Sequence, residues 1–405
     1  MRIATDAAGL SGARADQLRR AMGAKRSPER MEALKGDLMA GMEERGIDAP
    51  TRERIFEQLK GFADFGFPES HSFSFAHIVY ASSWLKVHAP EHFYAAILAS
   101  QPMGFYSPAT LVQDARRHGV RVVGPSVNDS LVEASVQRVS EDEAGESYSP
   151  GRPESLPLRA VVPLDVAADL AVRIGLNQVR GLGAAAERIV EARRRGAFTS
   201  QADLARRAHV SASAMEKLAM AGALECLGVG RREGAWAAGA LAQPHARSGQ
   251  WQPFLPGTEV GSLVPELPSL SEAERMRSDV DTTGLTPGKH PFSYVRATLP
   301  ATTLRAGDLG QHLAGRIVDV AGVVTHRQRP GTAAGTVFLN LEDETGLLNV
   351  VCSAGMWKRY RRVGRRASAL IVRGLVESAD GVTALVADRL DALEGIASTG
   401  SRDWC

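Results

Sequence analysis

Apolar residues recur at helical spacing along the first third of the chain. Between residues 27 and 46 the sequence reads "SPERMEALKGDLMAGMEERG", in which Ser27 suits a helix cap and Pro28 the first helical position. Four apolar residues of this stretch lie three or four positions apart: Met31, Leu34, Leu38 and Met42. Because this spacing places them on one face of a helix, we predict an α-helical domain for residues 1–125.

The pattern changes from helical to alternating after Thr302. Five segments rich in Val, Leu and Ile are candidate strands: 316–324, 336–343, 347–352, 369–377 and 382–389. A short helical segment, 356–363, separates the third from the fourth. Five strands with a helix at this place predict an OB-fold barrel over residues 301–395. Such a barrel either binds single-stranded nucleic acid on its strand face or docks a protein.

The remaining segments have weaker patterns. Residues 126–158 are polar and acidic without periodicity, which indicates a linker or loop. Short helices interrupted by glycines follow over 159–227, then a Pro/Gly-rich connector over 228–300, and a flexible tail is expected over 396–405. The sequence thus predicts a multidomain α+β protein.

Composition adds constraints on charge and compartment. The 405 residues carry a formal charge of only +2, but residues 172–233 hold 11 Lys/Arg against 6 Asp/Glu, so a basic surface is expected there. The three cysteines form no CxxC pair, which argues against a zinc site or disulfide framework: Cys226, Cys352 and Cys405. No run approaches the about 18 apolar residues of a membrane span. We therefore predict a cytoplasmic protein without a membrane partner.

The segment "LNQVRGLGAAAERIVEARRRGAF", from residue 176 to 198, is the strongest local motif. Gly181 and Gly183 form a turn between two short helices, as in a helix-hairpin-helix, and glycines let a phosphate approach the backbone. Arg180, Arg188 and the run 193–195 can add charge-assisted contacts to DNA. The alternative is an αα-hairpin whose glycines serve packing alone.

Two polar clusters in the helical region have several interpretations. Ser70, His71 and Ser72 could be a nucleophile with its base, a helix cap formed by Ser72, or a contact to a charged ligand. No nucleophile elbow surrounds the serines and no acid is marked to orient His71, which argues against a hydrolase. A basic cluster between residues 19 and 26 is either a solvated face or a clamp for a triphosphate: Arg19, Arg20, Lys25 and Arg26.

The acidic and histidine motifs do not predict a metal site. Asp279 and Asp281 are flanked by a charged helix end and a turn, so we expect a solvated loop. Residues 342–344, Glu-Asp-Glu, fall at the expected turn between the second and third strands. His88 and His92 match the spacing of a zinc peptidase motif, but Pro90 between them favours a helix that begins near itself and excludes His88.

Long strings of the sequence resemble a known family. "ADQLRRAMGAKRSPERM", "FADFGFPESHSFSFAHIVYASSWLKVHAPEHFYAAILASQPMGFYSPATLVQDARRHGV", "GLNQVRGLGAAAERIVEAR" and "RQRPGTAAGTVFLNLEDETGLLNVV" resemble, in this order, the C-terminal part of the bacterial DNA polymerase III alpha subunits. "SQPMGFYSPATLVQDARRHGV" is closer to the error-prone, damage-inducible branch, ImuC. The resemblance implies the end of the polymerase fingers, a helix-hairpin-helix domain and an OB domain.

The resemblance also implies site residues and partners. Arg19 and Arg20 would face the phosphates of the incoming nucleotide, and Ser70, His71 and Ser72 would lie near the nucleotide or the primer terminus. The expected DNA partners are the primer–template duplex and the single-stranded template. "QWQPFL" at Gln250 is a poor match to a clamp-binding peptide, so an ImuB-type partner protein is expected to link the chain to the sliding clamp.

This chain departs from the family pattern at its beginning. Family members carry a PHP domain and a palm with catalytic aspartates before the fingers, whereas this chain begins inside the fingers, as a truncated gene, a misplaced start codon or a separate fragment would. The family is a DNA-directed DNA polymerase that needs Mg²⁺ and acts in damage-induced mutagenesis and translesion synthesis. We expect this chain to hold no catalytic residue, to bind no metal and to be inactive alone. The alternative is a non-catalytic DNA-binding or scaffold protein of a repair complex.

Overall fold

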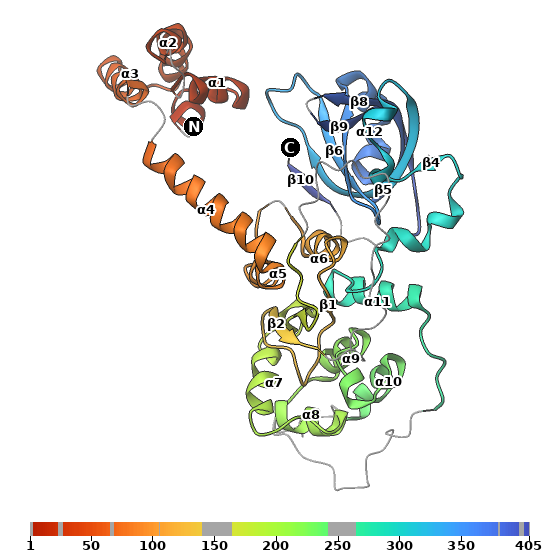
Figure 1. Cartoon of the computed structure of the whole chain (residues 1–405). Coiled ribbons are helices and arrows are strands. Elements are labelled where there is room, and N and C mark those ends of the chain that lie inside the picture. The colour runs from red at the N-terminus through yellow and green to blue at the C-terminus, as the bar shows by residue number, and fades with distance from the viewer. Residues whose placement is uncertain are drawn as a thin grey trace. The chain divides into compact units, whose positions relative to one another are not determined.

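A computed structural model describes residues 3–22, 27–64, 69–104, 106–139, 164–241, 265–379, 381–396 and 401–404 (Figure 1). The chain forms two compact units. One takes in residues 1–83 with 329–337, and the other takes in residues 84–328 with 338–404. None of the helices in these described ranges is long and apolar enough to cross a membrane.

The first unit is helical. A π-helical turn, η1 (Ile3–Ala7), is followed by α1 (Gly12–Met22), α2 (Ser27–Glu44), α3 (Ala49–Asp64) and α4 (Glu69–His88), whose last residues lie in the second unit. The predicted apolar face of α2 is the inner face, because Met31, Leu38 and Met42 are fully buried against Phe56 of α3 and the inner side of α1.

The second unit begins with two helices that pack on a small sheet. α5 (Pro90–Ala99) and α6 (Pro108–Arg117) cover β1 (Val122–Val123), β2 (Ser135–Arg138) and β3 (Leu170–Arg173), arranged in the order β1-β3-β2. β2 lies in the stretch for which the sequence predicts a loop, because its partner β3 is more than 30 residues away and leaves no local signal. Residues 140–163 lie outside the described ranges.

Short helices follow in the region of the predicted hairpin. They are η3 (Leu176–Gln178), α7 (Ala185–Arg193), α8 (Gln201–Ala208), α9 (Ala212–Met220), η4 (Glu225–Leu227) and α10 (Arg231–Leu241). The side chains of Ser200 and Ser211 accept the cap hydrogen bonds of α8 and α9. α11 (Glu272–Thr283) starts with a capping box formed by Ser271 and Glu274, within the stretch predicted as a connector.

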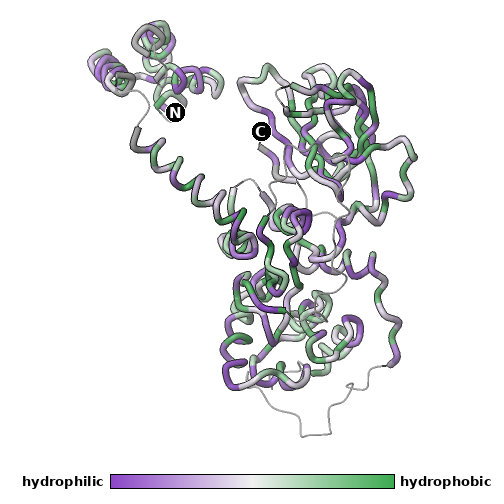
Figure 2. The backbone as a smooth tube through the Cα atoms, viewed as in Figure 1, coloured by the Kyte–Doolittle hydropathy of each residue, from purple (hydrophilic) through white to green (hydrophobic). Residues whose placement is uncertain are grey.

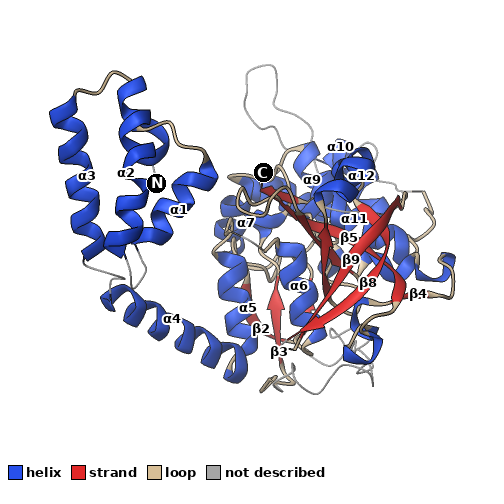
Figure 3. Ribbon diagram, turned by 90° about the horizontal axis from the view of Figure 1, so that it is seen from above, coloured by secondary structure: helices blue, strands red, loops and turns tan. Residues whose placement is uncertain are grey.

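The C-terminal part is a closed barrel, as predicted. After β4 (Thr303–Leu304) come β5 (Ile317–Gln328), β6 (Val337–Glu342), β7 (Leu347–Cys352), α12 (Ala354–Arg366), β8 (Ala369–Ala379) and β9 (Val382–Ala392), and β10 (Arg402–Trp404) pairs with β5 (Figure 3). Neighbouring strands run β5-β6-β7-β9-β8, and β8 pairs again with β5. β7 and β9 are parallel. This topology with a helix between β7 and β8 is OB-like and confirms the predicted fold class.

β5 extends four residues beyond the predicted strand. A bulge between Val324 and His326 bends it, so that its first half pairs with β8 and its second half with β6. A bulge of this kind lets one strand turn the corner of a barrel. The end of β5 carries two consecutive buried polar residues, His326 and Arg327, which a simple alternation of inward and outward side chains would not place side by side in the interior.

Candidate nucleic-acid interface

The hairpin predicted from the sequence lies between η3 and α7. Gly181 and Gly183 have φ of 76° and 50°, in the left-handed region that favours glycine. A Cβ on Gly181 would lie 2.5 Å from Nζ of Lys217, whereas a Cβ on Gly183 would meet no atom within 4 Å. The backbone at Gly183 is thus open to a ligand.

Apolar packing and hydrogen bonds fix the hairpin from behind. Leu176, Leu182 and Ile189 are buried in the core that α7 shares with α8 and α9. The amide of Arg180 donates to the carbonyl of Thr282 at the end of α11, at 2.8 Å. The turn is therefore held between two elements before any ligand arrives.

The exposed side of the hairpin offers unused donors. Within the described residues, the amides of Gly181, Gly183 and Ala184 donate to no protein acceptor. They lie at the start of α7, where the helix dipole adds a partial positive charge. Gly181 and Gly183 also line an open depression of about 420 Å³ between the hairpin, the end of α11 and the start of α6. This arrangement can bind a phosphate.

The predicted arginines around the hairpin differ in their partners. Arg180 is exposed and donates to the carbonyl of Asp281 at 3.2 Å, next to the depression. Arg188 is exposed as well, but its guanidinium bonds the carbonyls of Ala208 and His209 at the end of α8. Arg193 is half-buried against the carbonyl of Val127, and burial lowers its pKa. Arg180 is thus placed for a ligand, whereas Arg188 and Arg193 also hold the fold together.

Arg19 and Arg20 of α1 share one carboxylate in the first unit. Both are exposed and contact Asp16, at 2.9 and 2.8 Å. The hydrogen bond from Arg19 lowers the pKa of Asp16. The other two basic residues of the predicted cluster, Lys25 and Arg26, lie outside the described residues.

The Ser-His-Ser motif lies in the first turn of α4. The helix begins at Glu69, so Ser72 is inside it and the prediction that Ser72 caps the helix is wrong. His71 is exposed, with its ring 4.4 Å from that of Phe75 in an edge-on contact. Ser72 is also exposed, and the side chain of Ser70 is outside the described set.

Two surface features, on α4 and on α12, were not predicted from the sequence. Seven large apolar side chains of α4 are exposed, including Phe73 at 77 % and Tyr80 at 73 %, and hydrophobic residues (green) recur along this helix in Figure 2. α12 is densely basic. The string "KRYRRVGRR" could have revealed the second feature, because nine residues hold six cations and no acid.

Asp279 is not in a solvated loop, and that prediction was wrong. It lies in α11 and is 6 % exposed, because Arg231 of α10 reaches it at 2.6 Å and Thr286 donates to its other oxygen at 3.0 Å. Burial raises the pKa of this carboxyl, and the two partners oppose the rise. This carboxylate therefore links α11 to Arg231 of α10 by an ion pair.

The acidic turn at Asp343 and the histidine pair around Pro90 have the predicted backbone structure. Asp343 accepts from the amides of Thr345 and Gly346 in the turn between β6 and β7. His88 ends α4, and Pro90 starts α5, so the two histidines of the zinc-like motif lie on separate helices. In the described part of the chain, no three His, Cys, Asp or Glu side chains are grouped to hold a metal ion.

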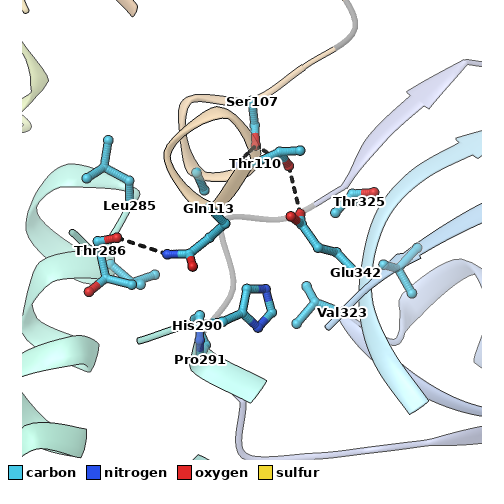
Figure 4. Close-up of a pocket in the computed structure, with 13 residues that line it drawn as sticks. Ser107, Thr110, Gln113, Leu285, Thr286, His290, Pro291, Val323, Thr325 and Glu342 are labelled. Atoms are coloured by element: carbon cyan, nitrogen blue, oxygen red, sulfur yellow. Dashed lines mark hydrogen bonds between the residues drawn. The ribbon is translucent and has the colours of Figure 1, made fainter. Parts of the chain in front are cut away.

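A small cavity lies where α6 meets the barrel (Figure 4). Glu342, at the end of β6, accepts from Thr110 at 2.9 Å and from Arg117 at 3.0 Å. On the other side, Gln113 donates to the carbonyl of Thr286 at 3.1 Å, and His290 lies below. The volume of about 50 Å³ holds a few water molecules and no nucleotide. These contacts fix the barrel to α6.

Two family models match the chain. Residues 119–234 match the helix-hairpin-helix motif, and residues 1–46 match the finger domain of the bacterial DNA polymerase III alpha subunit. Among solved structures, an asparaginyl-tRNA synthetase from Pyrococcus horikoshii covers 24 % of the chain at 20 % identity, with a TM-score of 0.21.

Curated relatives match from end to end. Error-prone DNA polymerases of Mycobacterium bovis and Nocardia farcinica are both 46 % identical over all of this chain, which covers 34 % and 33 % of their lengths. The enzyme of Corynebacterium glutamicum is 44 % identical, with 35 % of its length covered. The chain spans about a third of these relatives. Along its whole length, this chain is therefore homologous to a portion of the error-prone DNA polymerases.

Proposed function

We propose that this chain is the C-terminal, DNA-binding portion of an error-prone DNA polymerase that acts in damage-induced translesion synthesis. The observation that carries the proposal is the glycine turn before α7, where unused amides and Arg180 face an open depression. Such a turn binds the backbone of the primer–template duplex and reads no bases. The barrel would then hold the single-stranded template.

The first unit would supply contacts to the incoming nucleotide. Arg19 and Arg20 are exposed and could exchange Asp16 for a triphosphate, and His71 and Ser72 are exposed on α4. Nucleotidyl transfer needs two Mg²⁺ ions held by paired carboxylates. We propose that other parts of the complete enzyme hold these ions. Asp279 of this chain is paired with Arg231, which fits a structural role and not a metal-binding one.

Recruitment would depend on another protein in a reducing cytoplasm. We propose that an ImuB-type partner links the chain to the sliding clamp, since Gln250 begins only a poor clamp-binding peptide and lies outside the described residues. Cys226 and Cys352 are unpaired thiols, which fits a reducing compartment.

Blocking the glycine turn tests the proposal. Asn tolerates the left-handed conformation, so Gly183→Asn should keep the turn and obstruct only the approach of a phosphate. We expect about tenfold weaker binding of a primer–template duplex, which corresponds to the loss of one charge-assisted hydrogen bond.

Gly228→Asn is the matched control, because Gly228 has φ of 71° and equal open space but lies after η4. Equal duplex affinity and salt dependence for both variants would contradict the role of the hairpin. Primer extension by the chain alone should be absent, and synthesis would show that it holds a catalytic centre.

A further inference from the structure

We propose that the outward face of α12 is a second binding site for the phosphate backbone of DNA, separate from the hairpin and from the strand face of the barrel. The proposal rests on the proposed function, because it assigns a surface to the same ligand.

The charge of α12 has one sign. Residues 354–366 contain no Asp or Glu. Six cations of this helix are exposed: Lys358, Arg359, Arg361, Arg362, Arg365 and Arg366. In the described structure none of them has a carboxylate within 4.0 Å. Exposed arginines elsewhere, such as Arg194 with Glu191 and Arg206 with Asp203, do pair with acids.

The six cations lie on one side of the helix. The helix bends at Tyr360, whose φ of -103° and ψ of 15° are not helical. At 100° per residue the four arginines after the bend occupy an arc of about 140°, while Trp357 and Gly364 are buried on the barrel. From Arg361 to Arg366 the face is about 7.5 Å long, which matches about two phosphates of one strand, and Lys358 and Arg359 extend it beyond the bend. A single strand or one strand of a duplex can follow such a row.

The helix is rigidly attached to the barrel. Ser353 caps its first turn by accepting from the amide of Met356. At the other end the buried guanidinium of Arg327 donates to the carbonyls of Gly364 and Ala367, where it also complements the helix dipole. The cationic row is therefore held in place by contacts other than its own.

Six like charges at spacings of three and four residues repel one another and do not help the helix to fold. A polyanion removes this repulsion and releases its counterions. The only aromatic residues of α12 are Trp357, which is buried, and Tyr360, which is half-buried. The outward face thus lacks a stacking platform for bases, which favours contact with the backbone and no preference for sequence.

Charge removal tests the site. In the full chain, Arg361→Gln, Arg362→Gln and Arg365→Gln together remove the centre of the face and keep good helix formers. The matched control replaces three exposed arginines outside α12 that, in the described structure, also have no carboxylate within 4.0 Å: Arg54, Arg277 and Arg316. Fluorescence anisotropy with a thymine oligonucleotide and with a duplex, between 50 and 200 mM salt, gives affinity and salt slope for each.

We expect the α12 variant to bind the oligonucleotide about 100-fold more weakly at 0.1 M salt, with a salt slope reduced by about 2. A loss of affinity and of salt slope confined to the duplex would identify the duplex as the source of the strand. Unfolding temperatures should match, since all six residues are exposed.

Several outcomes separate the two proposals. If the unaltered chain binds neither DNA, the proposed function fails. If it binds and the α12 variant behaves like its control, the α12 site is refuted while the proposed function stands. A variant that keeps its DNA affinity but loses binding to polyglutamate or to phosphatidylserine vesicles would also refute it, because the face would then serve an acidic protein or a lipid surface.

Discussion

α4 and α12 both leave most of their surface uncovered, and they do so with opposite side chains. α12 buries a narrow side on the barrel and exposes six cations, as expected of an amphipathic surface helix. α4 exposes seven large apolar side chains: Phe73, Phe75, Ile78, Val79, Tyr80, Trp84 and Leu85. Helices that are apolar on all sides are normally buried.

The difference shows that exposed side chains in this chain are of two kinds, charged ones that water solvates well and apolar ones that it does not. The cations of α12 are well solvated, so the helix is stable as it is and can still gain from an anion. The apolar side chains of α4 lose free energy in water, which is typical of a surface that other protein covers. One helix is therefore expected to respond to salt, and the other to apolar probes.

Truncating one aromatic side chain on each helix should give the largest difference in stability between them. Trp357 is 8 % exposed, so Trp357→Ala should lower the free energy of unfolding of the barrel by about 3–5 kcal/mol. Phe73 is 77 % exposed, and Phe73→Ala should cost less than about 0.5 kcal/mol. Urea denaturation followed by circular dichroism measures both. Similar losses would mean that α4 is covered in solution.

A smaller effect separates the two sides of α12 itself. A Cβ on Gly364 would lie 2.5 Å from the ring of Trp357, so Gly364→Ala should cost about 1–3 kcal/mol through overpacking. A Cβ on Gly355 would meet nothing within 4 Å, and Gly355→Ala should stabilise the helix by about 0.5–1 kcal/mol. Urea midpoints of the barrel transition check the opposite signs. If both variants lose stability alike, the buried side is not defined by Trp357.

The barrel could be predicted from the sequence because its signals are local. Alternation over single strands and the helix after the third strand were sufficient for the topology. The two glycines of the hairpin were also recognisable, and both have the positive φ that such a turn requires. What these features share is that neighbouring residues determine them.

The errors concern partners that are distant along the chain. Asp279 is buried because Arg231, 48 residues earlier, pairs with it, and β2 exists because β3 lies beside it. The start of α4 at Glu69 could not be predicted from Ser72, because a serine is as compatible with the first turn of a helix as with its cap. The basic face of α12 was visible in the sequence, but its isolation from carboxylates required the structure.

The exposed cations of α12 and the buried His290 of the same unit should respond differently to acid. Guanidinium groups keep their charge at any ordinary pH. His290 is 7 % exposed, and its Nδ1 accepts from the amide of Phe292, which requires the neutral ring. Burial, helped by Arg117 and Arg296, lowers the pKa of His290 to about 3. In the unfolded chain this histidine binds a proton below its ordinary pKa of 6.5, so acid favours unfolding.

Above pH 6.5 the histidine is neutral in both states and does not lower the free energy of unfolding. As the pH falls from 6.5 towards 3, protonation in the unfolded chain lowers it progressively. Between pH 7.5 and about pH 5.5 we expect a loss of about 1.4 kcal/mol from this group. His290→Asn keeps an acceptor for Phe292 without a titrating ring, so urea denaturation at both values should show that much less pH dependence in the variant. An unchanged pH dependence would mean that His290 is not buried as a neutral ring.

Substitutions on α4 should change the stability least but should clearly reduce its exposed apolar surface. Replacing Phe73, Ile78 and Tyr80 by Gln removes three exposed apolar side chains and keeps the helix, at a cost of less than about 0.5 kcal/mol each. The fluorescence of an apolar dye such as ANS, and self-association measured by sedimentation, should both fall, because the apolar surface that drives them is gone.

The α12 triple variant is the reciprocal control for the α4 variant. It should leave dye binding unchanged, and the α4 variant should leave the salt dependence of DNA binding unchanged. Added salt should not weaken self-association through α4, because burial of apolar surface is not screened, whereas it should weaken any contact made by the cations of α12. If the α4 variant binds as much dye as the unaltered chain, the seven side chains are covered in solution, and α4 does not offer the apolar surface that distinguishes it from α12.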